Sequence, residues 1–208
     1  MWEDYVLKRC VFDWCGISLT ESPASRTVVR NVQMLNCEIR NCLCGPAIFD
    51  NVVVDGLNIS HNLLQCFGAL FRRVTLRGKI GRMMISSIAD PLALDRQPEF
   101  DASAEKFWQS VDWALDIREA QFIECDIRGI PARLIRRDEE TQVIVRREKA
   151  AEGEWRRLAL SDTQWPTALQ FMLDSGDPDT VLVASKRDRA FKRELAGLRL
   201  LRDAGIAE

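Results

Sequence analysis

The stretch Asn36–Ser60, "NCEIRNCLCGPAIFDNVVVDGLNIS", repeats its apolar residues at every fifth position. With Met34 taken as a centre, every fifth residue as far as Val74 is apolar, and so are seven of the nine residues that stand two positions before these centres. A period of five matches neither a helical turn nor the simple alternation of a flat strand. It does match a strand that points two residues inward and then turns a corner, because positions two apart in a strand share a face. The pattern therefore predicts a stack of four-sided coils.

The same frame recurs in two other segments. "CVFDWCGISL", residues 10–19, has centres Phe12 and Ile17, and "LDIREAQFIECDIRG", residues 115–129, has centres Ile117, Phe122 and Ile127. The complete set of centres predicted in the middle block is Met34, Ile39, Cys44, Phe49, Val54, Ile59, Leu64, Ala69 and Val74. We expect all of these side chains in the interior.

Several of these quintets resemble the motif of pentapeptide-repeat proteins, which is a small residue, Asp or Asn, Leu or Phe, and then two variable polar residues. "CDIRG", "AQFIE" and "CEIRN" fit this motif well, whereas "CLCGP" and "NLLQC" fit it poorly. The resemblance covers residues of about 10–19, 32–76 and 115–132. It implies a short right-handed quadrilateral parallel β-helix.

The remaining sequence predicts helices added to this mainly β fold. Residues 1–132 are expected to form the β-helix, with a helical insertion at about 87–114 whose helix runs from Ser103 to about Ala114. Residues 133–208 are expected to form a C-terminal α/β cap that is mostly helical. It begins with two short strands around the acidic turn of "ARLIRRDEETQVIVRREK". Its two main helices are expected to begin near Ser161, which has capping-box spacing to Gln164, and Ser185, and to end at Gly176 and Gly205.

The seven cysteines follow the same frame. Cys10, Cys15, Cys37, Cys42 and Cys125 stand two before a centre, and Cys44 is itself a centre. We therefore expect these six in the core as small hydrophobes. Cys66 and the single histidine, His61, fall at outward corners, too far apart for a Cys–His dyad. A structural zinc site needs four N or S ligands, so the sequence predicts neither a metal nor a cofactor.

The composition narrows the function class. Of 208 residues, 29 are Lys or Arg and 31 are Asp or Glu, giving a net charge of -2. This balance makes nucleic acid an unlikely partner. The sequence has no apolar run long enough for a membrane span and no signal peptide at its start. Seven cysteines without a secretion signal predict a reducing, cytoplasmic location. No phosphate loop, nucleophile elbow or zinc-protease motif is present, so a non-enzymatic role is expected.

Some apolar residues occupy outward positions. The candidate interaction surface consists of Trp14, Leu43, Ile48, Val53, Leu63 and Phe71. Leu70 and Leu76 also fall at outward positions. Leu43 and Leu63 are twenty residues apart, one coil, so they are expected to stack in one stripe with Ile48 and Val53. An exposed apolar patch marks a contact. Contact with the chain's own helices is favoured over an external partner.

Three functions remain open at this stage. The first is a protein–protein interaction module, such as a bacterial scaffold or an immunity-type inhibitor, that uses a rigid β-helix face. The second is a DNA-mimic regulator of a type II topoisomerase, which is what the resemblance implies for some members of the family. The third is an enzyme with its site in the C-terminal region. A homo-oligomer that forms through the β-helix end or the C-terminal helix is compatible with the first of these functions, the interaction module.

Overall fold

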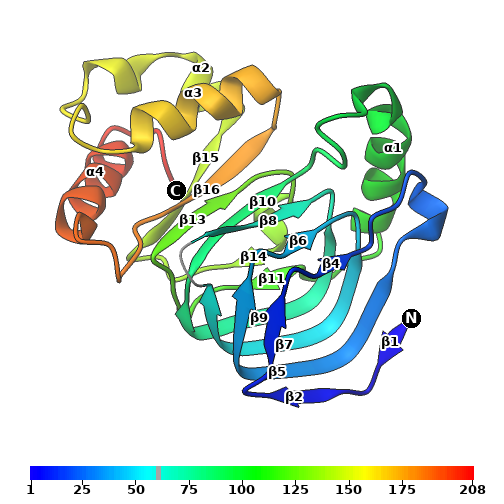
Figure 1. Ribbon diagram of the computed structural model, residues 1–208. Helices are drawn as coiled ribbons and strands as arrows, with labels where there is room; N and C mark the ends of the chain where they lie inside the picture. The colour runs from blue at the N-terminus through cyan, green and yellow to red at the C-terminus, as the bar shows by residue number, and fades with distance from the viewer. Residues whose placement is uncertain (60–61) are drawn as a thin grey trace.

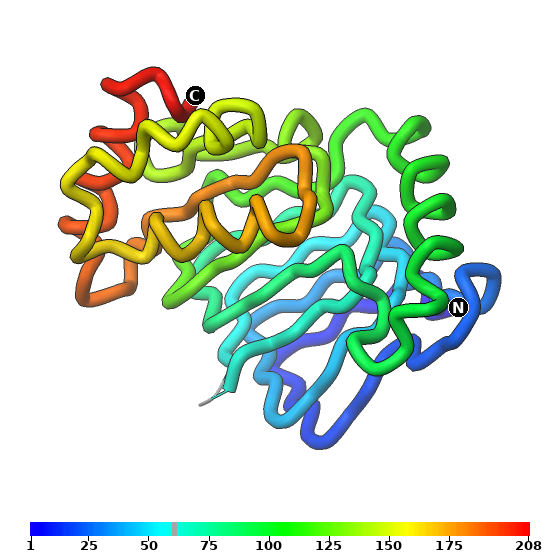
Figure 2. The backbone as a smooth tube through the Cα atoms, turned by 90° about the horizontal axis from the view of Figure 1, so that it is seen from above, coloured from blue at the N-terminus to red at the C-terminus, as the bar shows by residue number. Residues whose placement is uncertain are grey.

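The computed structural model describes residues 1–59 and 62–208, and it is mixed α/β with mostly parallel sheets and few helices (Figure 1). Two sheets contain the strands of the chain's first two thirds. Helices lie along one flank and beyond the C-terminal strands (Figures 1 and 2). The expectation of a mainly β fold with appended helices agrees with this arrangement.

The first sheet is built on three long parallel strands, which curve around the molecule (Figure 2). They are β5 (Val28–Arg40), β7 (Ile48–Ile59) and β9 (Leu70–Ile80). The short strands paired with β5 are β1 (Trp2–Glu3), β2 (Val6–Lys8) and β3 (Val11–Asp13), and those on the far side are β11 (Leu115–Asp116), β12 (Ala120–Gln121) and β14 (Ile135–Arg136). Consecutive long strands thus lie side by side although a strand of the second sheet separates them in sequence.

The second sheet has the order β15-β16-β13-β10-β8-β6-β4. Its strands are β4 (Gly16–Ile17), β6 (Leu43–Cys44), β8 (Leu63–Phe67), β10 (Arg82–Ser86), β13 (Glu124–Ile127), β15 (Gln142–Arg146) and β16 (Asp179–Val183). β4 to β13 pair in parallel, whereas β16 is antiparallel to both β13 and β15. β16 was not predicted from the sequence, although "TVLV" is a short run with β-branched residues.

The long strands bend at residues with left-handed backbone. Asn31, Asn36 and Asn41 in β5 and the following turn have φ of 52°, 51° and 50°, five residues apart. Asn adopts this conformation more readily than most residues. The side chains also tie neighbouring strands together, because Asn51 Nδ2 donates to Asn31 Oδ1 at 2.8 Å. The five-residue pattern of the sequence therefore coincides with bends in the strands.

The predicted inward positions are largely buried. In the last block, Ile117, Phe122 and Ile127 are at most 1% exposed. In the middle block the inward prediction is correct as far as Ile59. Beyond Ile59 the spacing between paired residues of neighbouring long strands changes. Ile39 in β5 pairs with Ile59 in β7, twenty residues on, whereas Val52 in β7 pairs with Val74 in β9, twenty-two residues on. The frame has slipped by two residues.

This slip makes part of the outward prediction wrong. Phe71 and Leu76 are buried, and the Phe71 ring stacks on Phe49 with centroids 5.6 Å apart. Leu43 pairs with Gln65 rather than standing beside Leu63, so the expected stripe does not form. Positions two apart share a face, which is why Leu64, Ala69 and Val74 remain inside as predicted.

The inserted helix exists, but its position was predicted wrongly. α1 spans Gln97–Trp108, six residues earlier than expected. Pro98 stands in its first turn, where the missing N–H costs nothing. The helix covers one side of the first sheet, as the Arg72 guanidinium lies 4.9 Å from the Phe107 ring and that of Arg26 lies 5.0 Å from the Phe100 ring.

The C-terminal helices end as predicted but do not begin as predicted. They are α2 (Arg147–Ala151), α3 (Trp165–Ser175) and α4 (Phe191–Asp203), and the 3₁₀ turns of the chain are η1 (Pro23–Ser25), η2 (Leu94–Arg96), η3 (Ala132–Leu134) and η4 (Glu154–Arg157). Gly176 and Gly205 are left-handed after α3 and α4. Neither Ser161 nor Ser185 caps a helix. Instead Glu194 accepts from the Gln164 N–H at the start of α3, at 3.2 Å.

The buried apolar residues form two clusters. One fills the parallel strands and extends to Ile144, Val181 and Val183. The other joins β15, β16 and the three C-terminal helices around Trp165 and Leu198. β15 and β16 contribute side chains to both clusters, so the C-terminal elements pack directly on the end of the second sheet.

Candidate functional site

The N-terminal strands have outer edges without partners. β1, β2 and β3 each pair only with β5, and β4 pairs only with β6, among the strands that the structure describes. The backbone N–H and C=O groups on their other side therefore face away from the sheets. We call this part of the molecule, residues 1–19, the open end. Unpaired strand edges are templates for pairing with another chain.

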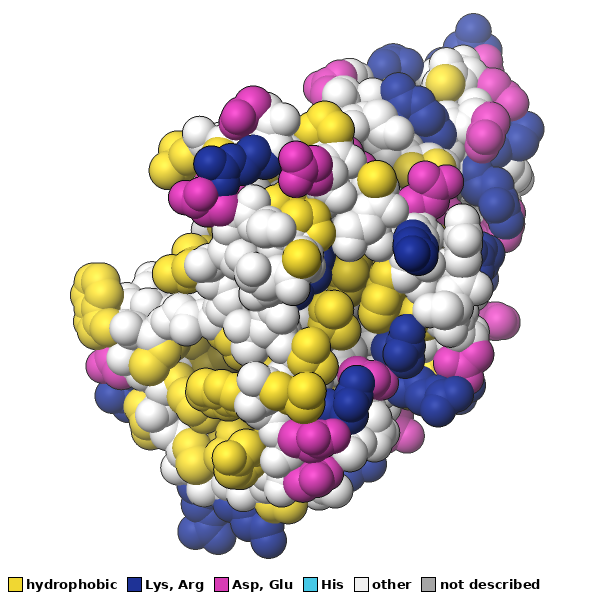
Figure 3. Space-filling model, turned by 90° about the vertical axis from the view of Figure 1, so that its right-hand side faces the viewer, with side chains coloured by type: hydrophobic (Ala, Val, Ile, Leu, Met, Phe, Trp, Pro, Cys, Tyr) yellow, Lys and Arg dark blue, Asp and Glu magenta, His cyan; other side chains and the backbone are white. Residues whose placement is uncertain are grey.

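Large apolar side chains are exposed on this open end. They are Met1, Trp2, Tyr5, Val6, Val11, Trp14 and Leu19. Trp14 is the most exposed of the seven, at 81%. It points outward as predicted, and its backbone is left-handed. Figure 3 shows hydrophobic side chains gathered around a hollow on its lower left. This concentration is greater than scattered surface residues explain.

The opposite end of the second sheet is closed by the chain itself. The N–H of Ile144 in β15 donates to the Glu208 carbonyl at 3.2 Å, and the Glu208 N–H donates back to Ile144 at 2.9 Å. Val145 forms an antiparallel bridge with Ala207. The last residues of the sequence thus cover the outer edge of β15.

The other residues predicted as an interaction surface do not lie together. Ile48 and Val53 are half-buried on two sides of the bend at Asn51, and Leu63 lies in the second sheet. Leu43 is partly exposed in β6. Only Trp14 belongs to the open end.

Sequence reasoning missed the first two strands of this end. "MWEDYVLKRC" carries the same period, since Trp2 and Leu7 precede Phe12 by ten and five residues. Leu7 is half-buried and packs against the first core cluster. Extending the frame backwards would have found β1 and β2.

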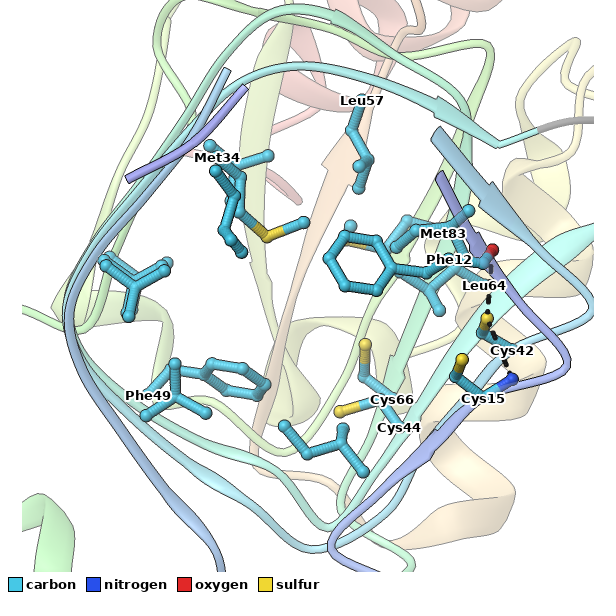
Figure 4. A pocket seen from close by; sticks show the side chains of 18 of the residues that line it. Phe12, Cys15, Met34, Cys42, Cys44, Phe49, Leu57, Leu64, Cys66 and Met83 are labelled. Atoms are coloured by element: carbon cyan, nitrogen blue, oxygen red, sulfur yellow. Dashed lines mark hydrogen bonds between the residues drawn. The ribbon is translucent and has the colours of Figure 1, made fainter. Parts of the chain in front are cut away.

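The open end leads into a cavity of about 190 Å³ between the two sheets. Figure 4 shows Met34 and Phe49 on one side and Cys44 and Cys66 across from them, with Phe12 between. Residues that line it come from β1, where Trp2 lies, as far as β10, where Met83 lies. The cavity therefore extends inward past the first strands.

Four cysteines line this cavity. Cys44 and Cys66 are neighbours on β6 and β8, and the hydrogen bond between their thiols, together with burial, raises the pKa of Cys44. The Cys15 N–H donates to the Cys42 sulfur at 3.4 Å. The prediction that Cys66 lies at an outward corner is wrong, because the slip in register turns it inward.

The cysteines predicted in the core differ in how far they are buried. Cys37, Cys44 and Cys125 are buried as predicted. The prediction is wrong for Cys15, which is exposed, and only partly right for Cys10 and Cys42, which are half-buried, because the open end leaves their inward faces uncovered. All seven cysteines have free thiols. Among residues 1–59 and 62–208, no three His, Cys, Asp or Glu side chains are placed to hold a metal ion. His61 lies outside the described residues.

Carboxylates on the outer faces of the long strands are paired with arginines. Asp50 lies between Arg30 at 3.3 Å and Arg72 at 3.7 Å. Asp55 pairs with Arg77 at 3.0 Å. These side chains run across adjacent strands and neutralise each other, so the faces present mixed charge rather than an acidic array.

Two partly buried carboxylates near the end of the second sheet, Asp126 in β13 and Asp179 in β16, have structural partners. Burial raises the pKa of Asp126, which pairs with Arg128 at 3.0 Å. Burial likewise raises the pKa of Asp179, whose Oδ1 accepts from the Ala132 N–H at 3.0 Å. Each carboxylate holds a backbone or side-chain donor in place, which is a role in packing.

None of the described helices is both long enough and apolar enough to cross a membrane. Comparison of the chain with models of protein families, with curated proteins and with solved structures finds no match.

Proposed function

We propose that this protein is a non-enzymatic protein–protein interaction module whose open end binds an extended segment of a partner protein. Its scaffold, in this proposal, is a right-handed four-sided parallel β-helix of the pentapeptide-repeat type. The scaffold interpretation is supported by the parallel pairing at offsets of twenty and twenty-two residues and by left-handed bends five residues apart.

The observation that carries the function is the contrast in edge protection. The chain covers the edge of β15 with its own residues but leaves β2 and β3 with an uncovered outer edge. Val6 and Val11, which are 56% and 52% exposed, stand on these strands. Addition of a strand to such an edge gives affinity through main-chain hydrogen bonds, and the flanking apolar side chains give specificity.

The charge of the open end indicates what kind of segment fits. Residues 1–19 contain three acids, Glu3, Asp4 and Asp13, and two bases, Lys8 and Arg9. A strongly charged segment would find no complementary field here. The expected partner segment is therefore apolar at alternate positions and nearly neutral, and its binding should weaken only modestly with salt.

DNA mimicry has less support. It requires unpaired acids at regular spacing, whereas Asp50 and Asp55 are paired with arginines. The absence of a recognisable catalytic motif in the sequence also favours a binding role over an enzyme. The cytoplasm remains the predicted location.

The test begins by identifying the partner at the open end. A photo-crosslinking residue is placed at position 11 and, in a control variant, at position 92, and each variant is tested in the cells of origin. The partner should be captured from position 11 and not from position 92. Leu92 is a suitable control because it is 97% exposed and lies outside the strands of the open end.

The affinity of the purified partner is then measured for the wild type and two variants. Val6→Lys with Val11→Lys should weaken binding at least about tenfold, since lysine on an edge strand opposes pairing. Leu92→Lys should leave it unchanged. If the open-end variant and Leu92→Lys weakened partner binding equally, the open end would not be the binding site. Capture of a second copy alone would make this end a dimer interface, and salt-sensitive inhibition of DNA gyrase would promote DNA mimicry.

A further inference from the structure

We propose that the cavity behind the open end is a binding site for a small neutral apolar molecule, of the size of benzene or toluene. This site is separate from the strand edges of the proposed function. It lies inside the parallel strands, between Met34 and Phe49 on one side and Cys44 and Cys66 on the other (Figure 4).

The volume sets the size of the ligand. The cavity holds about 190 Å³. An apolar protein cavity of about 150 Å³ stays dry and binds benzene. Pockets for drug-sized ligands begin at about 300 Å³. A single aromatic ring with a short substituent therefore fits inside it.

The lining sets the chemistry of the ligand. Apart from the indole of Trp2, no side chain that lines the cavity contains nitrogen or oxygen. A ligand with a hydroxyl or a charge would lose its hydrogen bonds to water and gain none, which costs several kcal/mol. Because the Cys66 thiol and burial raise the pKa of Cys44, the Cys44 thiol stays neutral and offers no charge to a ligand. The site thus selects against polar molecules.

The walls offer favourable contacts to an aromatic ring in particular. Phe49 and Phe71 stack with their planes 15° apart and form one aromatic wall. Met34, Cys44 and Cys66 present sulfur atoms toward the same space (Figure 4). Sulfur and aromatic groups attract each other beyond simple burial. An aromatic ligand is therefore preferred to an alkane of equal volume.

The cavity has a route to solvent at the open end. Cys15 is exposed and Leu43 is partly exposed, and both line the cavity. A ligand can enter from the open end beside the exposed Cys15, without separating β4 from β6, which are paired with each other. Deeper in the molecule the interior is filled, since Ile80, Ile85 and Phe122 are at most 1% exposed.

The experiment compares toluene with phenol, which has nearly the same shape but carries a hydroxyl group. Toluene at about ten times its dissociation constant should raise the melting temperature of the full chain by about 3–6 °C. Phenol at the same concentration should raise it far less. Calorimetric titration gives the two dissociation constants, and we expect at least a tenfold preference for toluene.

Two substitutions of the same kind locate the site. Cys66→Met fills the cavity and should abolish toluene binding, whereas Cys10→Met, at a half-buried thiol outside the cavity lining, should retain it. If Cys66→Met does not fold, Val54→Ile adds one methylene to the cavity wall and should weaken toluene binding measurably. Absence of toluene binding in the wild-type chain, equal binding of phenol, or full retention of binding in the folded cavity-filling variant would overturn the proposal.

Discussion

The strands nearest the N-terminus and those near residue 120 use the same five-residue pattern but enclose interiors of different density. Around Phe122 the centres are at most 1% exposed, whereas Phe12 and Ile17, at equivalent positions, are only half-buried beside a cavity. The outer strand edges of the two ends differ as well. The chain covers the outer edge of β15 and leaves the outer edges of β2 and β3 uncovered. A repeated pattern therefore specifies the direction of side chains but not how tightly they pack.

This difference has an energetic consequence. Terminal repeats of a stacked structure bury less surface than internal ones, since each repeat contacts only its neighbours. Stability should come mainly from the filled end, where the C-terminal elements add a second core. The open end contributes less to stability and keeps apolar surface available for binding.

Thiol labelling gives the largest expected contrast between the two ends. Cys15 is exposed, while Cys125 is buried and its burial raises the pKa of the thiol, which leaves less of the reactive thiolate. Labelling of the native protein with a maleimide should be more than about a thousandfold faster at Cys15, because Cys125 reacts only after opening of the structure. Mass spectrometry of timed samples measures both rates.

Cys66 sharpens the same measurement. It is buried beside Cys44 in the cavity wall, so it should react as slowly as Cys125. Labelling of Cys66 at the rate of Cys15 would show that a reagent of maleimide size reaches the cavity freely.

Truncation of equivalent phenylalanines should separate the ends by a smaller but direct energetic difference. Phe122→Ala should lower the free energy of unfolding by about 3–5 kcal/mol, because it leaves a large void in a filled interior. Phe12→Ala should lower it by only about 1–2 kcal/mol, since that ring is half-exposed already. Urea unfolding followed by circular dichroism measures both. Similar losses for the two variants would mean that the open end is as tightly packed as the filled one.

Much of the architecture could be predicted because its signal is local. The five-residue pattern identifies the inward positions from Val32 to Ile59 and from Leu115 to Ile127, and two left-handed glycines mark the ends of α3 and α4. The slip before β8 also had a signal. Asn62 and Arg72 were the only polar residues two before a centre, and Asn62 is exposed while Arg72 reaches outward to Phe107.

The candidate site was harder to predict because it depends on strand edges that no neighbouring strand covers. Trp14 was recognised as an outward residue, but nothing in the residues around Val6 and Val11 shows which edge the chain leaves uncovered. The cavity likewise results from long-range register, since Cys66 enters it only through the offset of twenty-two residues. The start of α4 was missed because Ser185 is buried after β16, a strand that was not predicted.

The smallest expected effect concerns the pH dependence of the filled end. Burial raises the pKa of Asp179 above its ordinary value, so the folded chain binds this proton more tightly than the unfolded chain does. Its contribution to stability is therefore complete below the unfolded pKa of about 3.9 and is lost as pH rises through the folded pKa. Asp179→Asn keeps an oxygen that can accept from the Ala132 N–H. This variant should be slightly more stable than the wild type at pH 7. Its stability should also decline less than that of the wild type as pH rises above 4.

Asp138 provides a matched control of opposite sign. Burial tends to raise its pKa, but the hydrogen bonds from Lys186, at 2.7 Å, and from Thr141 lower it overall. A lowered pKa contributes stability above the unfolded value that is lost as pH falls. Asp138→Asn should therefore be less stable than the wild type at pH 7, and the two should converge toward acid. Urea unfolding of both variants between pH 4 and pH 7 separates the cases. If Asp179→Asn loses stability at pH 7 as Asp138→Asn does, Asp179 acts through its charge, and its burial at the filled end does not determine its effect.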